Sequence, residues 1–335
     1  MKKIFVIAEV GVNHNGKLSL AKRLVDCAKK VGADAVKFQT YIAEHLTTDK
    51  TLTAEYQSKK KMSQLKLLKK LSLTFQENII LKKYAESKKI IFLSSAFDLE
   101  SLNFLIKLNI KYYKIPSGQI NDLPYLKMLG KYNKKILLST GMSSLKEIKN
   151  AINVLKKNGT KKKNITLLHC NSAYPTPYAD VNLNTIPFLK KKINIQVGFS
   201  DHSKGIIAPV IAVSHGARII EKHLTLNKLM KGPDHRSSLN PKEFSLMIKN
   251  MHIAETIMGL LQKKITISEK KNIKFVRKSI IAKKKIAAGE KFTIRNITTK
   301  RPGTGISPMN YYKLIGKKTK KNYAPNQSIS VKELF

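Results

Sequence analysis

Cysteine is scarce in this sequence: Cys27 and Cys170 are the only two among 335 residues. Cys27 falls in a helical pattern and Cys170 ends an apolar run, so the two thiols do not form a disulfide framework. Long apolar runs are missing as well, since none approaches the ~20 residues that a membrane span needs. We therefore expect a protein of the reducing cytoplasm that has no membrane partner.

Acidic residues and arginine are also few. The chain has 21 acidic and 64 basic residues, a net charge of +43, but only six of the basic residues are arginine. Arginine is the residue that most often forks onto phosphates and reads bases. The lysines occur in scattered groups, such as 161–163 and 190–192, without interleaved aromatic residues. This pattern favours a solvated basic surface and no specific nucleic-acid partner; a nucleic-acid role is the alternative that the charge alone suggests.

Eight short apolar runs recur along the chain, and each ends in a cluster of polar residues. Strands that are buried on both faces read as continuous apolar stretches of this kind. Eight of them separated by helix-length segments predict an α/β fold, a (β/α)8 TIM barrel, with its functional residues at the carboxyl ends of the strands. The runs are Ile4–Val10, Ala35–Gln39, Ile90–Ala96, Tyr112–Gly118, Lys135–Gly141, Ile165–Cys170, Gln196–His202 and Arg218–Leu224.

The pattern changes near residue 262. We expect a barrel over 1–262, a lysine-rich linker over 263–276 and a small β domain over 277–335, with short strands at 278–282 and 292–299. Within the barrel, the long loop after the second strand contains Ala54–Gln57 and is typical of a functional lid. Helical stripes separate the strands at 19–31, 101–108, 144–157 and 241–261.

Two lysines, Lys37 and Lys114, lie within apolar strands, where a lysine is rarely buried without a partner. Several strand-end hydroxyls accompany them. Ammonium groups with hydroxyl and backbone donors suit an anion such as a phosphorylated, carboxylated small molecule of about −3 charge. Lys114 also suggests an alternative chemistry, a Schiff-base aldolase.

Two histidines, His202 and His223, end the last two predicted strands. Two imidazoles with open positions suit a catalytic divalent metal. Asp201 and Glu221 stand beside them, either as ligands or as groups that orient the imidazoles. His14 is structural or positions substrate, and His169 is expected in the core.

Several motifs resemble the sialic acid synthase family, most closely its bacterial N-acetylneuraminate synthases. These are AEVGVNHNG, ADAVKFQT, AEYQ, YKIPSG, LLSTGMSS, LLHCNSAYPTPYADVNL, GFSDHSKG, EKHLTL, GPDHRSSL and KRPGTGISP. The resemblance implies a transferase that condenses phosphoenolpyruvate with an open-chain N-acylmannosamine-type sugar and forms a C–C bond. It also implies Mn²⁺ or Mg²⁺, a C-terminal antifreeze-like (SAF) domain, and a domain-swapped homodimer.

The resemblance assigns roles to particular residues. It gives phosphoenolpyruvate binding to Lys37, Ser95, Lys114, Ser117, Ser139, Ser172 and Ser200. It gives sugar binding to Gln39, Tyr174, Asp234 and, from the partner's small domain, Arg301; metal binding to His202 and His223; and catalytic positions to Glu9 and Gln119.

Three departures from the family pattern affect these expectations. Gln119 stands where the family usually has glutamate, so a charge and any base function are lost there. Ser95-Ala96 replaces a Thr-Pro pair, and Ser172-Ala173 replaces a more polar pair. We expect Gln119→Glu to raise the rate.

The favoured activity is N-acetylneuraminate synthesis. The alternatives are a legionaminic or pseudaminic acid synthase that uses a diacetamido-trideoxy sugar, a weakly active variant, and a non-catalytic binding protein.

Overall fold

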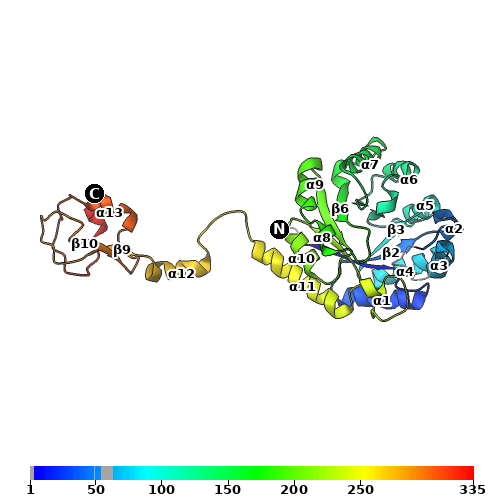
Figure 1. Cartoon of the computed structure of the whole chain (residues 1–335), viewed down its shortest axis with the longest axis horizontal. Helices are drawn as coiled ribbons and strands as arrows, with labels where there is room; N and C mark the ends of the chain where they lie inside the picture. The colour runs from blue at the N-terminus through cyan, green and yellow to red at the C-terminus, as the bar shows by residue number, and fades with distance from the viewer. Residues whose placement is uncertain (1–3, 49, 54–62) are drawn as a thin grey trace. The chain divides into compact units, whose positions relative to one another are not determined.

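The computed structural model describes residues 4–48, 50–53 and 63–335. The Ala54–Gln57 motif lies outside these residues. The chain forms two compact units, Met1–Gly259 and Leu260–Phe335, which we describe separately (Figure 1).

The first unit is a closed barrel of eight parallel strands in the order β1 to β8, in which β8 also pairs with β1. The (β/α)8 prediction is therefore confirmed. The strands are β1 (Phe5–Gly11), β2 (Ala35–Thr40), β3 (Ile91–Ala96), β4 (Tyr113–Ile115), β5 (Ile136–Ser139), β6 (Ile165–Cys170), β7 (Gln196–Asp201) and β8 (Ile219–His223).

Helices surround the barrel, and several of them begin where their sequence places a cap. In α7, for example, the Ser144 hydroxyl accepts a hydrogen bond from the Glu147 amide, and the Glu147 carboxylate accepts one from the Ser144 amide. In the described part of the barrel unit, the helices are α1 (Leu18–Lys30), α2 (Ala43–Leu46), α3 (Gln64–Leu71), α4 (Phe75–Ser87), α5 (Leu99–Lys107), α6 (Leu123–Gly130), α7 (Leu145–Lys157), α8 (Tyr178–Val181), α9 (Thr185–Ile193), α10 (Ile207–Ser214) and α11 (Pro241–Met258).

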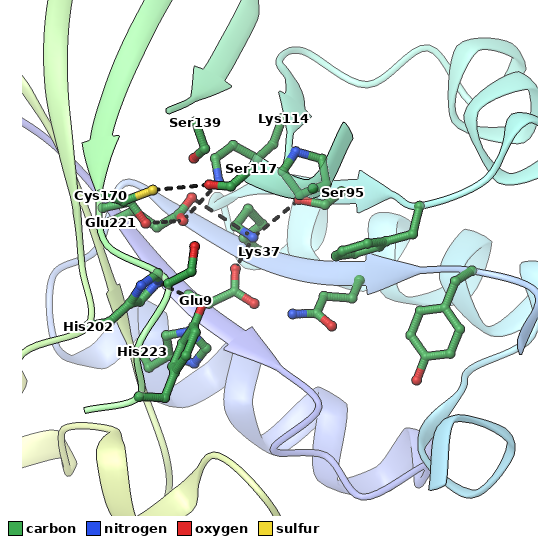
Figure 2. Close-up of a pocket in the computed structure, with 18 of the residues that line it drawn as sticks. Glu9, Lys37, Ser95, Lys114, Ser117, Ser139, Cys170, His202, Glu221 and His223 are labelled. Atoms are coloured by element: carbon green, nitrogen blue, oxygen red, sulfur yellow. Dashed lines mark hydrogen bonds and ion pairs between the residues drawn. The ribbon is translucent and has the colours of Figure 1, made fainter. Parts of the chain in front are cut away.

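The barrel interior has an apolar layer beneath a polar one. The apolar layer consists of Ile7, Ala35, Leu93, Leu137, Leu168 and Ile219. Successive side chains of a strand point to opposite faces, so the residue two positions further on points inward again. Those residues are Glu9, Lys37, Ser95, Ser139, Cys170 and Glu221, and all of them line one cavity (Figure 2). The strand alternation thus places the polar site directly above a hydrophobic plug.

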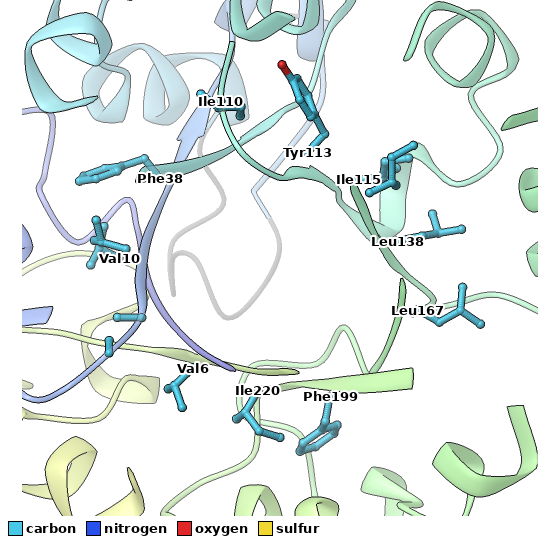
Figure 3. Packing of buried hydrophobic residues seen from close by; sticks show 14 of the residues in the cluster. Val6, Val10, Phe38, Ile110, Tyr113, Ile115, Leu138, Leu167, Phe199 and Ile220 are labelled. Carbon is cyan, nitrogen blue, oxygen red and sulfur yellow. The ribbon is translucent and has the colours of Figure 1, made fainter. Parts of the chain in front are cut away.

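The other face of each strand packs against the helices. Figure 3 shows this outer layer, which includes Val6, Phe38, Leu138, Phe199 and Ile220. Both faces of the strands are therefore buried, which explains their continuous apolar sequence.

The second unit has its own small core around Ile280, Ile286, Phe292 and Tyr323. Its two strands, β9 (Ser279–Ala282) and β10 (Ile297–Lys300), pair antiparallel. The predicted strand at 292–299 is thus shorter and begins later, because a turn in which the Asn296 amide donates to the Thr293 carbonyl precedes it. Helix α12 (Ile267–Val276) lies in the predicted linker, and α13 (Tyr311–Leu314) follows β10. Among the described residues of both units, no helix has the length and apolar character that crossing a membrane requires.

Candidate active site

A cavity of about 450 Å³ opens at the carboxyl ends of the barrel strands. It brings together most of the side chains that the sequence predicted for a site (Figure 2). The predicted residues that line it are Glu9, Lys37, Gln39, Ser95, Lys114, Ser117, Ser139, Ser172, Tyr174, Ser200, His202 and His223.

The floor of the cavity is a buried network of two lysines and two glutamates. Lys37 forms an ion pair with Glu9 and lies 3.9 Å from Glu221. Lys114 Nζ lies 3.1 Å from Glu221 Oε1, which also accepts a 2.8 Å hydrogen bond from the Ser200 hydroxyl. The lysines therefore have the partners that buried ammonium groups need.

The two glutamates of this network differ in protonation. Burial raises the pKa of Glu9 to about 7, although the Lys37 ammonium opposes the rise. Burial acts in the same direction on Glu221, but the ammonium groups of Lys114 and Lys37 outweigh it and lower the pKa of Glu221 to about 2. At neutral pH the network thus holds one fixed carboxylate and one carboxyl group that can gain or lose a proton.

Hydroxyl groups form a cradle beside Lys114. The Gly141 amide donates a 3.1 Å hydrogen bond to Ser117 Oγ, and the buried Ser139 Oγ has no hydrogen-bond partner among the described residues. A Cβ on Gly141 would come within 2.6 Å of Ser172 Oγ and 2.8 Å of Ser117 Oγ. The absence of a side chain on Gly141 therefore lets the Ser117 and Ser172 hydroxyls pack close to its backbone, and together with the unpaired Ser139 hydroxyl in the same cavity this arrangement suits a phosphate.

The two imidazoles lie side by side at one side of the cavity in an edge-to-face arrangement, with ring centroids 5.6 Å apart. His202 Nδ1 lies 2.5 Å from the Asn171 carbonyl oxygen, and its Nε2 lies 3.0 Å from the Tyr174 hydroxyl. Burial lowers the pKa of His202 to about 4 and that of His223 well below its usual range. Both rings are therefore neutral near pH 7, the form that binds metals.

The donor set around the imidazoles fits a divalent cation. The buried His223 Nδ1 and Glu9 Oε1 have no hydrogen-bond partner in the described part of the chain. Within residues 4–48, 50–53 and 63–335, however, no three His, Cys, Asp or Glu side chains are already grouped around a metal position. Two imidazoles with open positions would leave room for ligands from a substrate.

Three of the predicted site residues lie elsewhere. Asp234 is buried behind His223, with Oδ2 3.8 Å from His223 Nδ1, and burial raises its pKa to about 6. The Gln119 amide does not line the cavity but donates a 2.7 Å hydrogen bond to the Phe97 carbonyl oxygen. Arg301 lies in the C-terminal unit, where its Nε donates to the Val276 carbonyl oxygen.

The structure also decides what the sequence left open about the neighbouring residues. Glu221 belongs to the lysine network, whereas Asp201 points out of the barrel and pairs with Lys222. His14 is buried and accepts a hydrogen bond from the Gly16 amide. His169 is not part of the apolar core; it is half-buried and lies 2.8 Å from the Val181 carbonyl oxygen.

Several lining residues were not predicted. Cys170 could have been found from strand alternation, since it lies two positions after the inner residue Leu168. The outer wall comes from loops and from α2 and α3, and part of it belongs to the long loop after the second strand that the sequence predicted as a functional lid. It consists of Tyr41, Leu46, Gln64, Leu68, Phe97, Pro116, Gly118 and Met142.

Comparison with known proteins places this site in a family context. The NeuB family profile matches residues 24–263, and that of the SAF domain matches residues 277–334. An N,N'-diacetyllegionaminic acid synthase from Campylobacter jejuni is 49% identical over 98% of this chain and 99% of that protein. One from Legionella pneumophila is 39% identical over 97% and 93%. The crystal structure of an N-acetylneuraminic acid synthetase from Leptospira borgpetersenii is 34% identical, with a TM-score of 0.74 over 81% of this chain and 90% of that chain.

Proposed function

The chain belongs to the NeuB family and is a transferase that condenses phosphoenolpyruvate in nonulosonic acid synthesis. From this premise we propose that its acceptor is an open-chain diacetamido-trideoxy sugar. The chain would then be an N,N'-diacetyllegionaminic acid synthase. The identities support this acceptor, because the two legionaminic acid synthases are 49% and 39% identical to the chain and the N-acetylneuraminic acid synthetase 34%. The alternative acceptor of the sequence analysis thus replaces N-acetylmannosamine as the favoured one.

One observation carries the reaction class: two buried ammonium groups, a hydroxyl cradle and two neutral imidazoles line a single cavity. Lys37 and Lys114 would bind the carboxylate and phosphate of phosphoenolpyruvate, with the hydroxyl groups of Ser117 and Ser139 as further donors. The substrate oxygens would replace Glu9 and Glu221 as partners of the lysines. Until that exchange takes place, the two buried glutamates are the ion-pair partners of both lysines.

The chemistry then requires a proton acceptor. The enol carbon of phosphoenolpyruvate forms a bond to the aldehyde carbon of the sugar, and the aldehyde oxygen takes up a proton. Water adds to the carbon that bears the phosphate, and loss of phosphate from that carbon leaves the ketone. Glu9 suits the removal of the proton from water, because its pKa of about 7 lets it accept a proton near neutral pH. A divalent cation, Mn²⁺ or Mg²⁺, held by His202 and His223 would polarise the sugar aldehyde as a Lewis acid.

The wall of the cavity also agrees with a deoxygenated, doubly acetylated sugar. Leu46, Leu68, Phe97 and Met142 give it apolar surface, and Gln39 and Gln64 add amide groups. A methyl group in place of a hydroxymethyl group, and two acetamido groups, would contact such a wall better than hydroxyl groups would.

Phosphate release with two acceptors tests the proposal. We expect release from phosphoenolpyruvate to require a sugar, to stop with a chelator, and to show a kcat/KM at least 10-fold higher for the diacetamido-trideoxy sugar than for N-acetylmannosamine. Lys37→Met is the inactive control. The reverse preference would restore the N-acetylneuraminate assignment. Phosphate release that continues in the presence of a chelator would contradict the role of the metal.

The homodimer also stays a proposal, in which Arg301 of one copy serves the barrel of the other. Mixing Lys37→Met with Arg301→Ala tests it, since exchange of copies would create sites with both residues intact. Activity that returns on mixing supports the exchange, and an inactive mixture contradicts it.

A further inference from the structure

Asp201 and Lys222 form a buried ion pair in the barrel wall, outside the cavity. Lys222 Nζ lies 2.5 Å from Asp201 Oδ2, and both side chains are only 1% exposed. The two residues are direct partners across the β7–β8 ladder. Each is followed in the chain by one of the two cavity imidazoles, His202 after Asp201 and His223 after Lys222. Strand alternation therefore turns the ion pair outward and both imidazoles inward.

The same ammonium group also contacts the residue on the other side of His202. Lys222 Nζ donates a 2.5 Å hydrogen bond to the Ser203 carbonyl oxygen, and the Ser203 amide donates a 2.8 Å hydrogen bond to Asp201 Oδ1. The β7–β8 ladder ends at Asp201, so His202 lies beyond its last paired residue. The side chains of Asp201 and Lys222 thus hold the backbone before and after His202 on the β8 side, whereas on the other side the His202 carbonyl accepts a 2.9 Å hydrogen bond from the Thr176 amide.

We propose that the Asp201–Lys222 ion pair is a positioning device that sets the spacing and orientation of His202 and His223. A buried charge pair is stable in only a narrow range of geometries, because any separation leaves two charges without solvent. The Lys222 ammonium, which contacts both Asp201 Oδ2 and the Ser203 carbonyl oxygen, therefore fixes the backbone beside both imidazoles. This inference rests on the proposed function as far as the imidazoles are taken to bind a metal.

Mn²⁺ binding to the metal-free full chain tests the proposal without any turnover. The variants are Lys222→Met, Asp201→Asn and the double variant, which removes both charges and so avoids a lone buried one. Arg218→Met is the matched control: Arg218 directly precedes β8, at the end opposite His223, and lies 3.6 Å from Glu255. We expect the Kd for Mn²⁺ to rise about 10- to 100-fold in all three test variants and to stay within about twofold in the control.

Thermal stability separates positioning from folding. The single variants are expected to lower Tm, and the double variant to recover most of the loss while its Kd for Mn²⁺ stays raised. A double variant that recovers both would overturn the proposal, since the pair would then serve stability alone. An unchanged Kd in all three variants would overturn it as well.

A second readout needs no metal. The Asn171 carbonyl can only accept, so His202 Nδ1 must carry the proton, and ¹⁵N NMR of labelled histidine reports this tautomer. We expect one tautomer in the natural chain and in Arg218→Met, and a mixture in the double variant. If the natural chain binds no Mn²⁺, the metal assignment fails and only the tautomer measurement tests the positioning role. A mixture of tautomers in the double variant then supports this role, and an unchanged tautomer overturns it.

Discussion

Glu221 Oε1 lies 3.1 Å from Lys114 Nζ, although the two residues are 107 positions apart in the sequence. The Glu221 carboxylate is thus already paired with the Lys114 ammonium group, which the proposed reaction needs for binding phosphoenolpyruvate. The cavity therefore holds an internal anion before the substrate arrives. In the proposed reaction, binding of phosphoenolpyruvate would exchange one anion for another and would keep the buried lysines compensated.

This exchange predicts that Glu221→Gln destabilises the free protein and that an anion reverses the effect. Loss of the buried carboxylate leaves Lys114 and Lys37 undercompensated, which should lower the free energy of unfolding by about 3 kcal/mol. Melting curves with and without inorganic phosphate measure this effect. Glu86→Gln, which breaks an exposed ion pair with Lys82, should cost no more than about 0.5 kcal/mol and should show no phosphate rescue. A Glu221→Gln melting point that phosphate leaves unchanged would contradict the exchange.

The raised pKa of Glu9 predicts that the stability of the folded protein falls as the pH rises toward 7. Its pKa rises from 4.5 to about 7 in the folded protein, so its contribution is fully present below about pH 4.5 and is lost as the pH rises through 7. Glu9→Gln removes this loss, so the stability of the variant relative to the natural chain should increase by up to about 3 kcal/mol between pH 4.5 and 7.5. Melting curves of both proteins at several pH values measure this difference in stability. The titration of the histidines contributes equally to both proteins and therefore cancels in the difference. A difference that stays constant with pH would show that Glu9 titrates normally.

Gly141→Ala should weaken phosphoenolpyruvate binding without unfolding the barrel. The new Cβ would lie 2.6 Å from Ser172 Oγ and 2.8 Å from Ser117 Oγ, so the cradle must open or lose a hydroxyl. We expect the KM for phosphoenolpyruvate to rise about 10-fold or more, equivalent to about 1.4 kcal/mol. Gly118→Ala adds a methyl group to the same cavity with no atom within 4 Å and should change KM less. Equal effects of the two variants would argue against the cradle.

Gln119→Glu tests whether a carboxyl group at this position serves the reaction. The Gln119 amide now donates to the Phe97 carbonyl, and a carboxylate there would be repelled by the same oxygen and turn away. We expect a higher kcat, as the family pattern predicts, and a lower kcat for Gln119→Ala, which only loses the hydrogen bond. If both variants lower kcat equally, the contact with Phe97 is the function of this residue.

The sequence alone predicted the fold and most of the strand-end residues that line the cavity. Apolar runs identify strands because strand burial is a local property of each segment, and alternation places Lys37 with Gln39 and Glu221 with His223 on one face. The closed order of the strands then follows from the fold that such runs predict. Every cavity residue that the sequence named on β1, β2, β3 and β8 lies where it was expected.

Only the tertiary structure decided which of these groups become partners. Alternation separates Asp201, one position before His202, from Glu221, two positions before His223, but only the closed barrel pairs the first with Lys222 and the second with Lys114. The Gln119 amide donates to the Phe97 carbonyl instead of lining the cavity, and the outer wall of the cavity comes from loops and from α2 and α3. The physical reason is that alternation along a strand is set by neighbouring residues, whereas the partner of a buried charge is set by closure of the barrel, which joins residues far apart in the chain.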